Sequence, residues 1–125
     1  MWKVYKNSNE DLNFALGCLY CQCISLSEFK LWIEKVIRDT NSDNIPNYLF
    51  DLLDFNEPLF HMSNVIGFTV KNNLSEEDKL ALYGIAYLRG VKIYDPPVTR
   101  NIALNYLENK PEISNKFNRF FKDIV

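Results

Sequence analysis

Three cysteines within six residues are the side chains of this chain best suited to metal or redox chemistry. Cys18, Cys21 and Cys23 share the sequence with a single histidine, His61. A structural zinc site needs about four ligands, and His61 is the only other good candidate. A redox Cys-x-x-Cys motif normally opens a helix after a strand, and no strand is expected here. We therefore predict small, buried, structural thiols, with neither a metal nor a disulfide.

The other residue types give no pattern of an enzyme active site. The chain has no phosphate-binding glycine loop, no nucleophile elbow and no pair of metal ligands at helical spacing. His61 could act as a general base only beside a nucleophile, and the sequence places neither Ser63 nor a cysteine there. We predict no catalytic residue, no metal, no cofactor and no enzymatic activity.

Carboxylates are the charged groups that the sequence concentrates in one place. Residues 39–78 hold eight acidic residues and one cation, Lys71, which gives a net charge of −7. Residues 1–38 carry +1 and residues 79–125 carry +4, so the whole chain carries only −2. Segregated charge creates a local potential that steers an oppositely charged protein. We expect these carboxylates to converge on one surface that binds a basic partner.

Acids with nearby aromatic residues make the centre of this segment the strongest candidate for partner contacts. Asp51, Asp54 and Glu57 follow one another at intervals of three residues, so their carboxylates could be presented together. Tyr48 and Phe55 stand beside them, and aromatic side chains are enriched at the centres of interfaces.

The remaining acids of the segment have simpler explanations as well. Glu76, Glu77 and Asp78 could serve mainly to complement the dipole of the helix that they begin, and Asp39 and Asp43 could only solvate a loop. The predicted partner-binding set is Asp39, Asp43, Tyr48, Asp51, Asp54, Phe55, Glu57, Glu76 and Glu77.

Composition predicts one folded domain. A chain of 125 residues with 47% hydrophobic and 14% aromatic residues has ample material for a core. No apolar run approaches the length of a membrane span, and the start of the chain lacks the apolar region of a secretory signal. We therefore expect a cytoplasmic protein that does not bind membranes.

Explicit start signals predict an all-α fold of six or seven helices. Acidic residues follow directly after Ser8. Ser25 and Glu28 form a capping box, and Ser75 and Asp78 form a second one. Apolar residues then recur at helical spacing, whereas Phe68–Val70 has strand propensity but is too short for a sheet. The predicted helices cover about 9–22, 25–39, 46–53, 58–67, 75–90, 98–109 and 111–124.

A repeated glycine suggests how the helices pair. Leu16-Gly17-Cys18-Leu19-Tyr20 matches Tyr83-Gly84-Ile85-Ala86-Tyr87, with glycine three residues before tyrosine in both. A mid-helix glycine costs about 1 kcal/mol relative to alanine, so its recurrence indicates a close approach of another backbone. We predict one domain made of a helical hairpin (9–39), an acidic connecting segment (40–74), and a second hairpin with a C-terminal helix (75–125). Internal duplication of a helix pair would explain the repeat.

A local resemblance covers residues 83–107. Gly84-x-x-Tyr87-x-x-Gly90, followed by Ala103, resembles a unit of the Sel1-like helical repeat family. The loop here is longer than usual, and in the first half Cys23 stands where the second glycine would be. The resemblance implies a scaffold for protein contacts.

A wider resemblance spans most of the chain. Its motifs are Leu16-Gly17-x-x-Tyr20, Ser25-Leu26-x-Glu28-x-x-x-Trp32, Ile45-Pro46-x-Tyr48-x-x-Asp51-Leu52-Leu53-Asp54 and Leu82-Tyr83-Gly84-Ile85-Ala86-Tyr87-Leu88-Arg89-Gly90. Their order resembles small all-helical immunity proteins of bacterial contact-dependent growth inhibition and related polymorphic toxin systems. The resemblance implies a bacterial cytoplasmic inhibitor that binds a cognate toxin domain, often a nuclease.

The charge pattern agrees with that implication. A nuclease binds a polyanion and is usually basic around its active site, so an acidic inhibitor can occupy the same field. The alternative is a helical-repeat adaptor that binds another basic protein. Direct binding of nucleic acid is not expected, because the +4 of residues 79–125 is typical of solvated helix faces.

Overall fold

Seven α-helices and two short 3-10 helices make up the regular structure of residues 1–125, all of which the computed structural model describes. The predicted all-α class is therefore confirmed, and Phe68–Val70 forms no strand. None of the helices combines the length and the apolar content needed to cross a membrane. The elements are α1 (Glu10–Tyr20), α2 (Leu26–Asp39), η1 (Ser42–Asn44), α3 (Tyr48–Leu53), η2 (Leu59–His61), α4 (Met62–Ile66), α5 (Glu76–Leu88), α6 (Arg100–Glu108) and α7 (Pro111–Phe121).

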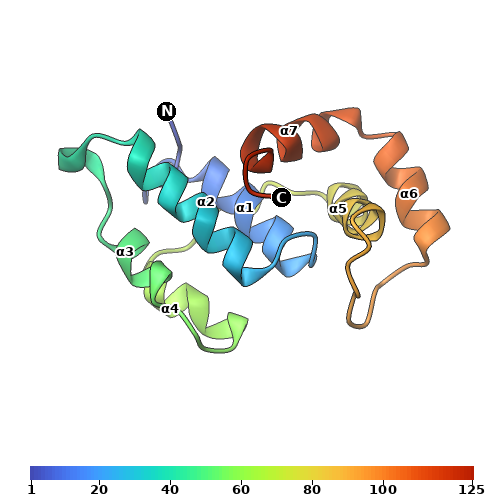
Figure 1. Ribbon diagram of the computed structural model, residues 1–125, viewed down its shortest axis with the longest axis horizontal. Helices are drawn as coiled ribbons and strands as arrows, with labels where there is room; N and C mark the ends of the chain where they lie inside the picture. The colour runs from blue at the N-terminus through green and yellow to red at the C-terminus, as the bar shows by residue number, and fades with distance from the viewer.

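The α1–α2 hairpin occupies the middle of the molecule. Helices α3 and α4 lie toward one end of the long axis, and α5 and α6 lie toward the other (Figure 1). Helix α7 returns to the hairpin, where Phe120 stacks on Trp32 of α2 with 5.8 Å between ring centroids. Trp2 packs edge-on against both rings. The first and last segments of the chain thus close one aromatic core over the hairpin.

Both predicted capping boxes form. In each box, the serine hydroxyl accepts the backbone N–H of the acid three residues later, and that acid accepts the serine N–H. The distances are 3.1 and 2.8 Å for Ser25 and Glu28, and 3.0 and 3.1 Å for Ser75 and Asp78. These bonds satisfy backbone donors that the first turn of a helix leaves without partners.

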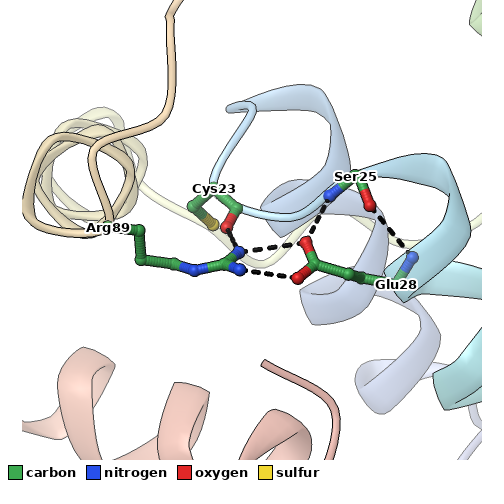
Figure 2. Close-up of polar contacts among 4 residues, drawn as sticks. All are labelled: Cys23, Ser25, Glu28 and Arg89. Atoms are coloured by element: carbon green, nitrogen blue, oxygen red, sulfur yellow. Dashed lines mark hydrogen bonds and ion pairs between the residues drawn. The ribbon is translucent and has the colours of Figure 1, made fainter.

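Each capping acid also holds a cation from another helix. Arg89, just after α5, donates two hydrogen bonds to the carboxylate of Glu28, at 3.0 and 2.6 Å (Figure 2). The same guanidinium donates to the carbonyl of Cys23 in the turn between α1 and α2. Lys110, at the start of α7, lies 3.1 Å from the carboxylate of Asp78. In each case, therefore, the same carboxylate caps its own helix and also joins that helix to an element distant in the sequence.

Charge pairing governs the titration of Glu28. Burial alone would raise the pKa of this carboxyl, but the hydrogen bonds from Arg89 and from the backbone of Ser25 outweigh burial and lower it. The ionised form is therefore the one that the fold stabilises.

The two repeated glycines occupy different environments. A Cβ atom placed on Gly84 would lie 2.7 Å from the carbonyl oxygen of Ala103 in α6, so the predicted close crossing of helix backbones occurs there. A Cβ atom on Gly17 would instead meet a methyl group of the Leu74 side chain, at 2.3 Å. The prediction is thus wrong for Gly17, because the neighbour there is a side chain of the connecting segment. The sequence repeat does not correspond to a repeat in packing.

Candidate functional site

All three cysteines are buried, as predicted. Cys18, Cys21 and Cys23 are buried free thiols, and the Cys23 thiol donates to the Cys18 carbonyl at 3.3 Å. Burial raises the pKa of Cys21 to about 12 and raises that of Cys18 well above its usual value. No group of three or more His, Cys, Asp or Glu side chains is arranged to hold a metal ion.

Native thiols should therefore resist alkylation. Because the reactive species is the thiolate and all three thiols are buried, we expect iodoacetamide at about pH 8 to modify the folded protein much more slowly than the urea-unfolded protein. Intact mass spectrometry should show unmodified folded protein under conditions that place three adducts on the unfolded chain. Rapid labelling of Cys21 in the folded state would contradict the raised pKa.

The acidic segment does not form one surface. Residues 40–66 build η1, α3, η2 and α4 at one end of the molecule, and the connection that follows crosses to α5 on the other side of the hairpin (Figure 1). The acids that begin α5 are therefore separated from those of residues 39–57. The expectation of a single convergent acidic surface is wrong, because the chain crosses α1 between the two groups.

The acids at the start of α5 face cations from their own part of the fold. Glu76 lies 3.4 Å from Lys79, one turn later, and Glu77 lies 4.0 Å from Lys110. Asp78 is partly buried, which would raise its pKa, but hydrogen bonds from Ser75 and Lys110 outweigh burial and lower it. Glu76 and Glu77, predicted to bind a partner, are exposed and also complement the helix dipole and neighbouring lysines.

The prediction that Tyr48 and Phe55 contact a partner is also wrong, because both side chains lie in the core. The Tyr48 hydroxyl donates to the carbonyl of Val4 at 2.5 Å, and its ring packs edge-on against Phe68. Phe55 is only 3% exposed. Tyr48 lies on the inward side of α3 and Phe55 follows just after the helix, and neither ring is available to a partner.

Asp39 and Asp43 differ in their contacts within the chain. The carboxylate of Asp39 accepts a hydrogen bond from the indole N–H of Trp2 at 3.0 Å, so it helps to fix the N-terminal segment on α2. Asp43 is exposed on η1 and has no ion-pair partner. Only Asp43 of this pair presents a free carboxylate.

Three predicted acids remain unpaired beside α3. Asp51, Asp54 and Glu57 are exposed, and none forms an ion pair within the chain. Two large aromatic rings accompany them on the same stretch, since Phe50 is 47% exposed and Phe60 is 76% exposed. We call Phe50, Asp51, Asp54, Glu57 and Phe60 the acidic strip.

The two exposed phenylalanines were missed from sequence, and the helical phase of α3 could have identified one of them. With Leu49 and Leu52 facing inward, Phe50 falls outside the buried stripe while Phe55 falls within it. No comparable signal marks Phe60, which lies in a short 3-10 helix, where its ring packs at a tilt against that of His61 with 4.2 Å between centroids. An exposed aromatic ring beside unpaired carboxylates offers a partner both apolar area to bury and negative charge to pair with.

Comparisons of this chain with protein families, with characterised proteins and with solved structures found no match.

Proposed function

We propose that this protein is an immunity protein that neutralises a bacterial toxin domain by docking its acidic strip on the toxin's basic substrate-binding face. The observation that carries the proposal is the set of exposed carboxylates without intramolecular partners, Asp51, Asp54 and Glu57. Asp43 adds a fourth negative charge on the neighbouring η1.

Electrostatics gives this strip a physical advantage. Residues 40–70 contain no lysine or arginine, so no cation of the same segment cancels the field of the strip. Such a field accelerates encounter with a basic protein, and Phe50 and Phe60 can then be buried at the contact. A nuclease is the toxin class that best fits, because its substrate-binding face must attract phosphates.

Reversing charge in the strip should slow binding. We expect Asp51→Lys with Asp54→Lys to reduce the association rate constant for the toxin domain by about tenfold or more at low salt. Protection of cells that express the toxin should be lost in parallel. Surface plasmon resonance across a salt series measures the effect, which should shrink as salt screens the charges.

Glu34→Lys with Glu108→Lys is a matched control. Both acids are exposed on other helices without ion pairs, and the change in net charge is the same. The control should retain most of the association rate. Equal effects of the two double variants would mean that net charge alone matters, and unchanged binding of the strip variant would place the interface elsewhere.

The second candidate function is a helical-repeat adaptor for another basic protein. The backbone crossing of α5 and α6 at Gly84 and Ala103 favours it, because a close helical hairpin is the unit from which such scaffolds are built. The upstream gene separates the two functions. A large secreted protein with a variable toxic C-terminus supports the immunity protein, and its absence favours the adaptor.

A further inference from the structure

A groove that shares no lining residue with the acidic strip is large enough for a partner segment. It lies between α1, α5 and the connection 67–74, and encloses about 1020 Å³. Leu16, Ile66, Val70 and Leu74 are among its apolar lining residues. This volume is at the upper end for binding pockets.

Two asparagines at the start of α1 hold one edge of the connection. Asn9 and Asn13, the only buried polar residues of the chain, lie one turn apart. The Asn9 side-chain oxygen accepts the backbone N–H of Lys71 at 3.0 Å. The Asn13 amide, oriented by its neighbours, donates to the Lys71 carbonyl and accepts the N–H of Asn73, both at 3.1 Å. Asparagine side chains thus replace a neighbouring strand on this edge.

The opposite edge of the connection is left open. In an extended chain, successive residues direct their N–H and C=O groups to opposite sides. Lys71 directs both its N–H and its C=O toward α1, and Asn73 directs its N–H there, which is the alternation of an extended chain. On that alternation the backbone groups of Val70 and Asn72 face away from α1, and neither residue forms a backbone hydrogen bond. Both residues line the groove. An unpaired extended edge is a template for an added strand.

The lining of the groove has no net charge, which favours an uncharged occupant. Its only charged lining residues are Glu76 and Lys79, which lie 3.4 Å apart and neutralise each other. The remaining polar lining consists of neutral groups such as Ser63, Asn64 and Thr69. A nucleic acid or a strongly charged peptide would meet no countercharge here. An occupant with an uncharged backbone and apolar side chains matches the polar and the apolar parts of the lining.

We propose that this groove receives an extended peptide segment of uncharged residues from a partner protein, which pairs as a β-strand with the free edge at Val70 and Asn72. A strand that pairs along residues 69–73 has about five residues and a length of about 16 Å. This site is distinct from the acidic strip, and either proposal can fail without the other.

Capped hexapeptides test the pairing. A library of N-acetylated, C-amidated peptides built from Val, Thr, Ser, Asn, Phe and Tyr is screened by fluorescence polarisation, and we expect binders with Kd below about 1 mM. The best binder is then remade with N-methyl groups at even or at odd positions. Strand pairing predicts about tenfold weaker binding in one register, where two hydrogen bonds are lost, and little change in the other. Equal binding in both registers, or no binder, would overturn the proposal.

Val70→Pro tests the same edge from the protein side. It removes an N–H that has no backbone partner, so the fold should persist, while peptide affinity should fall about tenfold. Val70→Thr retains the N–H and the branched shape, and should bind normally. Wild-type affinity in Val70→Pro would overturn the proposal. The proposal would also be overturned if sedimentation showed a dimer of the wild type that Val70→Pro does not form, because the edge would then bind a second copy of the chain.

Discussion

Replacing Arg89 with methionine should lower the free energy of unfolding by about 2–3 kcal/mol. The change removes both hydrogen bonds to Glu28 and the bond to the Cys23 carbonyl, while the methionine keeps much of the apolar stem. The two side chains are only 24% and 19% exposed, so water cannot fully replace the lost partner. Urea denaturation, followed by circular dichroism at the helix band of about 222 nm, measures the loss of unfolding free energy.

Lys79→Met is the matched control for Arg89→Met. It removes a cation from the pair with Glu76, whose side chain is 88% exposed. An exposed pair of this spacing on a helix contributes about 0.5 kcal/mol or less. If the two variants lost the same stability, the Arg89 contacts would have no special part in joining α2 to α5.

Acid should narrow the difference between wild type and Arg89→Met to the part that comes from the bond to the Cys23 carbonyl and from packing. The folded pKa of Glu28 is below its ordinary value of 4.5, so the contribution of the ionised carboxylate is fully present above about pH 4.5. It is lost as the pH falls through the lowered folded pKa. The gap between the two unfolding free energies should therefore shrink between about pH 7 and about pH 3. A difference that stayed constant over this range would show that lost packing, rather than lost charge pairing, destabilises the variant.

Gly84→Ala should lower the free energy of unfolding by about 2 kcal/mol, even though alanine is the better helix former. The added Cβ atom would lie 2.7 Å from the Ala103 carbonyl oxygen and 2.9 Å from the Leu107 Cβ. Neither atom can move by a side-chain rotation, so α5 and α6 must separate. Thermal and urea denaturation both report the loss.

Gly17→Ala is the control, because the sequence repeat treats the two glycines as equivalent. At Gly17 the close atom is a methyl group of Leu74, a half-buried side chain that can change rotamer. The helix-propensity gain of about 1 kcal/mol then offsets the small rearrangement, and stability should change by less than about 1 kcal/mol. Equal losses at both positions would contradict the difference in packing.

The sequence by itself determined the helices, because their signals are local. Ser25 with Glu28 and Ser75 with Asp78 lie within one turn, and both boxes form where they were predicted. Apolar periodicity and Pro111 placed the other helices to within a few residues. The close backbone approach at Gly84 was also predicted, since glycine inside a helix has a cost that packing must offset.

Only the tertiary structure decided which acids are free. Arg89 is 61 residues from Glu28, and Lys110 comes from another helix than Asp78, so no local pattern could assign these pairs. Composition counted all the carboxylates of residues 39–78 alike, whereas the crossing of the chain over α1 separated Asp51 and Asp54 from the acids of α5. Burial and charge pairing depend on contacts between distant segments, and those contacts exist only once the helices have packed.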